Sequence, residues 1–86
     1  MILDIKNEKG LHARASAKFV EVCEQFDATA TVSNDGESAG GDSIMGLLML
    51  AASKGTQIKV ETDGPEADAL ADALRDLVDG LFGEGA

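Results

Sequence analysis

The sequence contains no tryptophan and no tyrosine, and its only aromatic residues are three phenylalanines among 86 residues. Sites that stack nucleic acid bases or sugar rings depend on exposed aromatic side chains. Basic residues are also scarce, because seven Lys and Arg stand against sixteen Asp and Glu and leave a net charge of −9. Such a chain is repelled by nucleic acid phosphates and by anionic lipid surfaces. We therefore expect neither nucleic acid nor a membrane among its partners.

Cysteine and histidine occur once each, as Cys23 and His12. One cysteine cannot form an internal disulfide, and this pair is too small a ligand set for a standard zinc site within one chain. Cys23 falls on the apolar face of the first predicted helix, which indicates packing rather than reactivity. The N-terminus has no charged region followed by an apolar run, and no stretch approaches membrane-spanning length. We expect a soluble, cytoplasmic protein that uses no metal and no other cofactor.

Hydrophobic periodicity predicts the element order β-α-β-β-α-β-α within one domain over residues 1–86. Alternating apolar and polar residues indicate the first, second and fourth strands, and apolar residues every three or four positions indicate the helices. The third strand is short and is predicted mainly because the turn before it requires a return strand. The hairpin signal Asn-Asp-Gly at residues 34–36 joins the second and third strands. We expect the tail, residues 83–86, to fray. The predicted strands cover residues 3–6, 28–33, 37–40 and 57–62, and the predicted helices cover residues 13–25, 44–52 and 67–81.

The most informative stretch runs from the first strand into the first predicted helix. Gly10 permits a tight bend there, and His12 lies where the helix should begin. The first turn of a helix has free N–H groups and the positive end of the macrodipole, so a phosphate on His12 would meet an anion site. Arg14 can add a guanidinium fork for phosphate oxygens. Residues 9–20 contain three Lys and Arg residues and no acidic residue, which is exceptional in so acidic a chain.

A lone histidine at a helix start is usually only a cap or a surface residue. The sequence Gly-Leu-His-Ala-Arg at residues 10–14, followed by small residues and Lys-Phe-Val, nevertheless resembles the active-site signature of the HPr family. That family comprises the histidine-containing phosphocarriers of the bacterial phosphotransferase system, with the usual pattern Gly-(Ile/Leu)-His-x-Arg-Pro-Ala. Ala15 stands where most members have Pro, a form similar to the nitrogen-related NPr branch. Alanine suits an early helical position but lacks the preset backbone angle of proline.

A second motif supports the resemblance. Residues 43–46, Ser-Ile-Met-Gly, resemble the family's regulatory-serine segment at the matching distance from the histidine. Ser43 is also well placed as the N-cap of the second helix, and both roles can hold. Element order alone does not separate this topology from a ferredoxin-like one. The resemblance favours an α+β, HPr-like open-faced β-sandwich, in which a four-stranded antiparallel sheet carries three helices on one face.

The resemblance implies that His12 accepts a phosphoryl group from enzyme I and passes it to a IIA-type protein, as a carrier rather than a turnover enzyme. Neutral imidazole suits this role because it is both a good nucleophile and a good leaving group near pH 7. The Ser16 hydroxyl either helps to hold the phosphate or packs inward, and spacing leaves both open. The groups expected to stabilise the phosphate are the Arg14 guanidinium and the amides of Ala13, Ala15 and Ser16.

Docking on partner proteins requires an apolar patch beside the histidine. Spacing alone leaves Met45 and Leu48 undecided between core and surface, and the resemblance favours the surface. Leu47 and Leu50 are interpreted as core. The predicted docking residues are Leu11, Ile44, Met45 and Leu48.

Two other functions compete with the carrier hypothesis. One is a non-carrier regulatory module with an HPr fold, although family members of that kind lack the active histidine that His12 supplies here. The other is a ferredoxin-like ligand or RNA module, which the acidity and missing aromatic residues disfavour. For the carrier we expect a monomer, with an HPr kinase/phosphorylase as a further partner acting on Ser43. The sequence does not distinguish sugar uptake from nitrogen-related regulation.

Overall fold

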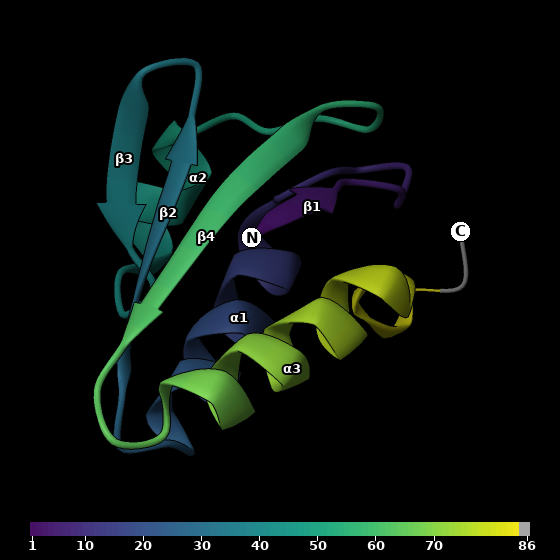
Figure 1. The fold of residues 1–86 in the computed structure, drawn as a ribbon. Helices are drawn as coiled ribbons and strands as arrows, with labels where there is room; N and C mark the ends of the chain where they lie inside the picture. The colour runs from purple at the N-terminus through teal and green to yellow at the C-terminus, as the bar shows by residue number, and fades with distance from the viewer. Residues whose placement is uncertain (85–86) are drawn as a thin grey trace.

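The computed structural model describes residues 1–84 and contains the predicted strands and helices in the predicted order (Figure 1). The sheet has the strand order β1-β4-β2-β3, and each neighbouring pair is antiparallel. A 3-10 turn, η1, follows the last helix and completes the described chain. The strands are β1 (Ile2–Asp4), β2 (Thr29–Asn34), β3 (Glu37–Gly40) and β4 (Gln57–Asp63), and the helices are α1 (Ala13–Glu24), α2 (Ile44–Met49), α3 (Ala67–Asp79) and η1 (Leu81–Gly83).

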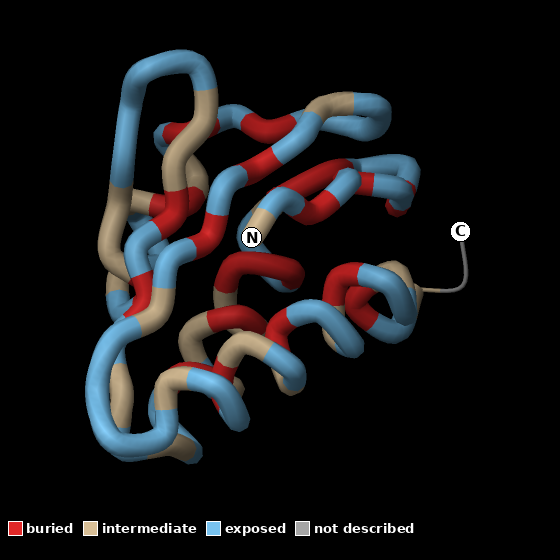
Figure 2. Tube along the Cα trace, in the orientation of Figure 1, coloured by how far each residue is buried: buried red, intermediate tan, exposed pale blue. Residues whose placement is uncertain are grey.

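The core lies between one face of the sheet and the helices, where the buried segments face one another (Figure 2). Alternate residues of β4 are buried, as the period of a strand with one covered face requires. Cys23 belongs to this core, and its burial raises the pKa of the thiol to about 11, so the thiol stays protonated at neutral pH. The predicted packing role of Cys23 is confirmed. Fully buried members include Val32 and Ile58 from the sheet with Phe19, Leu47 and Leu70 from the three helices.

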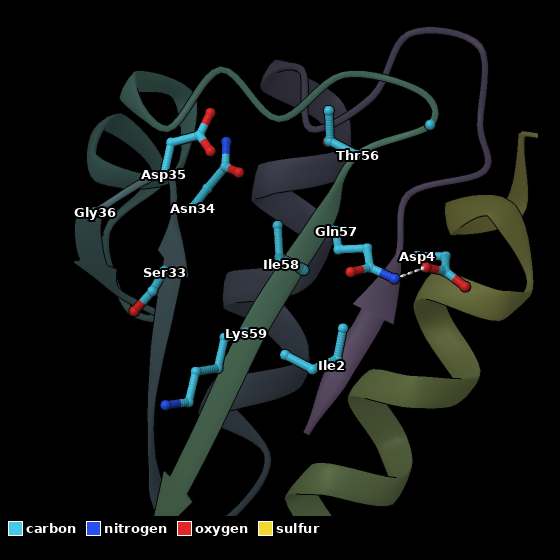
Figure 3. Close-up of a pocket in the computed structure, with 11 residues that line it drawn as sticks. Ile2, Asp4, Ser33, Asn34, Asp35, Gly36, Thr56, Gln57, Ile58 and Lys59 are labelled. Atoms are coloured by element: carbon cyan, nitrogen blue, oxygen red, sulfur yellow. Dashed lines mark hydrogen bonds between the residues drawn. The ribbon is translucent and has the colours of Figure 1, made fainter.

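The opposite face of the sheet is open. Ile2 is 57% exposed there, and polar side chains surround it. Figure 3 shows a hollow on this face that extends from the turn between β2 and β3 to the β1–β4 pair, where the Gln57 amide donates a 2.9 Å hydrogen bond to Asp4. Antiparallel sheets commonly carry one solvated face, so this arrangement needs no further partner to be stable.

Gly10 connects β1 to α1 in a conformation that only glycine adopts easily. Its φ is +63°, and a Cβ atom there would lie 2.3 Å from the carbonyl oxygen of Ala52. The next residue, Leu11, donates its N–H to that same oxygen at 2.8 Å. The chain entering α1 is therefore held against the segment after α2, and this contact sets the position of His12.

The second helix is shorter than predicted. It ends at Met49, whereas the apolar run predicted a helix through Ala52. Ala51 has a φ of +52°, which breaks the helical path. The break allows Ala52, 3% exposed, to enter the core and to accept the hydrogen bond from Leu11.

The C-terminal segment also departs from its prediction. The third helix ends at Asp79 rather than Leu81, because Leu81 and Phe82 adopt φ values of +59° and +52°. Phe82 is only 1% exposed, and its carbonyl accepts a 2.6 Å hydrogen bond from the Lys18 ammonium. The prediction that the tail frays is therefore wrong for Gly83 and Glu84, which follow this anchor, and residues 85–86 lie outside the described chain. No helix within residues 1–84 is long and apolar enough to cross a membrane.

Candidate functional site

His12 caps the N-terminus of α1. Its backbone is extended, with φ −79° and ψ −175°, and its Nδ1 accepts a 3.3 Å hydrogen bond from the N–H of Arg14. The side chain is 25% exposed. Serine, threonine or aspartate usually take this capping role through an oxygen lone pair. Here the lone pair of a ring nitrogen faces the positive end of the helix, where an anion is stabilised.

The other ring nitrogen, Nε2, contacts the carboxylate of Glu84. The second oxygen of that carboxylate accepts a 3.0 Å hydrogen bond from the Asn7 side chain. The hydrogen bond from Asn7, and after it the one with His12, lowers the pKa of Glu84 below its ordinary value, so the group is ionised at neutral pH. An ionised carboxylate only accepts hydrogen bonds, hence Nε2 must carry the proton. The neutral ring therefore leaves Nδ1 unprotonated.

A cavity of about 410 Å³ opens beside His12. Arg14 is exposed at its edge and forms no ion pair within residues 1–84, so its guanidinium is available to an incoming anion. Glu8 also borders the cavity, but its carboxylate is paired with Lys54 at 2.8 Å, which lowers the pKa of Glu8. The lining residues are Glu8, Lys9, His12, Arg14, Lys18, Gly83 and Glu84. They differ from those of the hollow on the open sheet face.

The predicted phosphate-stabilising amides are only partly available. Ala13 is exposed in the first turn of α1, but Ala15 and Ser16 are fully buried. The Ser16 N–H donates to the carbonyl of His12 at 2.8 Å, and its hydroxyl donates to the carbonyl of Leu11 at 3.3 Å. The Ser16 amide is therefore engaged within the helix, and its side chain packs inward because the amphipathic face of α1 turns it to the core. The side chain of Ala15 lies on that same face, but its backbone N–H belongs to the first turn of α1, so the expected role of this amide stays a prediction. The first-turn amides at the site are those of Ala13, Arg14 and Ala15, of which the Arg14 N–H is bonded to His12 Nδ1.

The predicted docking residues have different environments. Met45 is 68% exposed, Ile44 is 40% exposed and Leu48 is half-buried. Leu11 is 3% exposed and belongs to the core, because its backbone is bonded to the segment after α2. It is therefore corrected from a docking residue to a core residue. Met49, 73% exposed, was not predicted, although it follows Met45 by four positions on the same helix face.

Ser43 is the N-cap of α2, as predicted. Its hydroxyl oxygen accepts a 2.9 Å hydrogen bond from the N–H of Gly46. A Cβ atom at Gly46 would lie 3.0 Å from that oxygen, so the small residue keeps the cap geometry relaxed. The side chain is half-buried at the start of a helix that packs against α1.

Three site residues had no predicted role. Lys18 belongs to the basic run around His12, and this run was the only signal that pointed to it. Asn7 is fully buried and bonds both Glu84 and the carbonyl of Gly10, at 3.0 and 2.8 Å. Glu84 lies 72 positions from His12, in a glycine-rich tail. No pattern of sequence spacing reports a contact over that separation.

Comparisons with known proteins agree with this geometry. The family model described as "PTS HPr component phosphorylation site" matches residues 2–79. The phosphocarrier protein HPr of Neisseria meningitidis is 49% identical over 83 residues, covering 96% of this chain and 93% of that protein. The phosphocarrier protein NPr of Shewanella violacea is 40% identical over 82 residues, covering 95% and 90%.

The fold agrees as well. A crystal structure of HPr from Thermoanaerobacter tengcongensis superposes with a TM-score of 0.92 at 36% identity, covering 98% of this chain and 94% of that one. The open-faced α+β sandwich is thus confirmed, and the ferredoxin-like alternative is set aside. Sequence, fold and the histidine at the helix N-terminus together show that the chain belongs to the HPr family of phosphocarrier proteins of the phosphotransferase system.

Proposed function

We propose that His12 accepts a phosphoryl group from phospho-enzyme I on Nδ1 and transfers it to a IIA-type protein. The observation that carries this proposal is the position of Nδ1, which accepts the Arg14 N–H at the positive end of α1, beside a guanidinium that forms no ion pair with the described residues 1–84. In the transfer, the Nδ1 lone pair forms the N–P bond as the bond from phosphorus to the donor breaks. The donor's leaving atom keeps that electron pair, and Nε2 keeps its proton. Positioning and charge stabilisation are the main requirements of such a step.

The charges around the cavity favour reversible binding. Arg14 and the α1 N-terminus stabilise the added negative charge, while the open position of the guanidinium avoids an enclosed phosphate trap. A carrier has to release its group as readily as it takes it. A small number of solvent-exposed contacts to the phosphate meets that requirement.

The proposal extends to docking and regulation. Ile44, Met45 and Leu48 on α2 form the apolar surface expected to contact enzyme I and the IIA-type protein. We expect Ser43 to be the site of a regulatory phosphate added by an HPr kinase/phosphorylase, in a monomeric cytoplasmic protein. The hydroxyl at a helix N-terminus supports this, because the dipole tolerates a phosphate there.

Mass spectrometry after incubation with phosphoenolpyruvate and enzyme I tests the carrier function. We expect an acid-labile gain of one phosphate on the wild-type chain and none on His12→Ala. The substitution removes the capping hydrogen bond, at a cost of about 1 kcal/mol in the free energy of unfolding, together with the contact to Glu84. The variant should remain folded. Acid-labile phosphate on the folded His12→Ala variant, or none on the wild type, would contradict the proposal.

A further inference from the structure

We propose that Glu84 is a positioning residue for His12, whose carboxylate holds the proton on Nε2 throughout phosphoryl transfer. This inference rests on the proposed carrier function and adds to it a residue beyond the 2–79 segment that the family model matches. Glu84 therefore acts on Nε2, the ring nitrogen that does not take the phosphoryl group.

Both oxygens of Glu84 are engaged. One contacts His12 Nε2, and the other accepts a 3.0 Å hydrogen bond from the Asn7 side chain. Asn7 is fully buried and also donates to the carbonyl of Gly10 at 2.8 Å. The carboxylate is thereby tied to the same turn that carries His12, and its side chain is only 16% exposed. A carboxylate fixed by a buried hydrogen-bond donor orients an imidazole better than a mobile one.

The backbone conformation of the residues before Glu84 brings this residue to His12. Leu81, Phe82 and Gly83 have φ values of +59°, +52° and +76°, a run that an unconstrained tail would not adopt. Phe82 is buried in the core, and Lys18 of α1 donates to its carbonyl at 2.6 Å. These two anchors hold the left-handed turn, which reverses the chain after α3 and brings Glu84 to His12.

The chemistry follows from the proton on Nε2. When Nδ1 forms the N–P bond, the ring becomes an imidazolium, and the adjacent carboxylate balances its charge. In the return step the N–P electron pair goes back to Nδ1, and the leaving group is a neutral imidazole because Nε2 is still protonated. A ring that had lost this proton would have to leave as an imidazolate, which is a much poorer leaving group. The charged groups around the ring are Glu84 at Nε2, with Lys9, Arg14, Lys18 and the Lys54-paired Glu8 bordering the cavity.

The experiment compares phosphoprotein stability across pH in the full chain. Wild type, Glu84→Gln, Glu84→Asp and the control Glu8→Gln are charged with phosphoenolpyruvate and enzyme I, and loss of phosphate is followed between about pH 5 and 10. Glu8→Gln removes the same charge from the same cavity but not from the ring. The rate of phosphate loss should fall as the pH rises. Without the Glu84 carboxylate, the pH midpoint of this fall should move down by about one pH unit. Glu84→Asp should shift it less, and Glu8→Gln should match the wild type.

Long-range ¹H–¹⁵N NMR on the unphosphorylated wild-type protein gives a second readout that needs no variant. We expect Nε2 protonated and Nδ1 unprotonated in the neutral ring. The opposite tautomer would overturn the proposal. So would a Glu84→Gln profile that superimposes on the wild type, or faster charging of Glu84→Gln, since the carboxylate would then compete with the phosphoryl group. Failure of enzyme I to phosphorylate the wild-type protein would instead contradict the carrier function itself.

Discussion

At the scale of single residues, the two nitrogens of His12 have different surroundings. Nδ1 faces the N–H of Arg14, and Nε2 faces the carboxylate of Glu84. The imidazole thus contacts its own helix through one nitrogen and the segment after α3 through the other, and the difference between these neighbours determines which nitrogen can act as nucleophile. The proposed chemistry depends on this asymmetry more than on the exposure of the ring.

Substitution of Arg14 provides a direct test at the scale of a single residue. Arg14→Lys keeps the charge but loses the two-pronged guanidinium, so transfer from enzyme I should slow by about tenfold. Rapid-quench measurement of phosphoryl transfer checks this. Arg75→Lys is the matched control, since Arg75 is the chain's other arginine and lies on α3, near Asp72. Equal rates for Arg14→Lys and wild type would show that Arg14 contributes only its charge.

At the scale of elements, α2 combines a cap, a core contact and an exposed apolar face in six residues. Leu47 is buried, whereas Met45 and Met49 are the most exposed large apolar side chains among the described residues. The helix is too short to be stable alone, so Ser43 and the packing of Leu47 hold it in place. The same short element therefore determines both the local fold and the proposed docking surface.

Ser43→Asp tests regulation at this element. Aspartate is also a good N-cap, so circular dichroism and thermal stability should change little. The added charge beside Met45 should weaken docking, and we expect transfer from enzyme I to slow by about tenfold at matched salt. Ser38→Asp adds the same charge on the opposite face of β3 from Ala39, which packs against α2, and serves as control. If the folded Ser43→Asp variant transfers at the wild-type rate, Ser43 is a helix cap and not a switch.

At the scale of the whole molecule, the chain carries a net charge of −9, whereas Lys9, Arg14 and Lys18 border the site. The basic cavity is therefore a local exception in a negative field, and the acidic surface discourages non-specific binding to nucleic acid. The site also joins distant parts of the molecule, because the β1–α1 connection meets the segment after α3 there. Its geometry depends on the packing of Phe82 into the common core.

Acid unfolding reports this long-range connection. The folded-state pKa of Glu84 is lowered, so its contribution to stability is present above the ordinary value of 4.5 and is lost as pH falls through the lower folded value. Wild type should therefore lose more stability than Glu84→Gln between about pH 5 and pH 3. Urea unfolding at several pH values checks this. Parallel pH profiles for the two proteins would mean that the Glu84 contact adds no pH-dependent stability.

Features that depend on neighbouring residues were predictable from the amino-acid pattern. Alternation and helical spacing predicted β1, β2 and β4 and the helices α1, α2 and α3 in order, and the hairpin signal at residues 34–36 predicted β3 and its pairing with β2. The cap residues His12 and Ser43 were also predictable, because caps are local and both follow a turn. The acid-free run around His12 indicated an anion site before any contact was known.

The side chains that complete the site are brought together by the packing of distant segments. Leu11 was predicted at the surface but is drawn into the core by the contact between Gly10 and Ala52. Glu84 was predicted to fray but is held at His12, because the burial of Phe82 outweighs the backbone strain of the turn before it. Periodicity reports which way a side chain points within its own element. It does not report which distant segment will meet it, because that depends on the packing of the whole core.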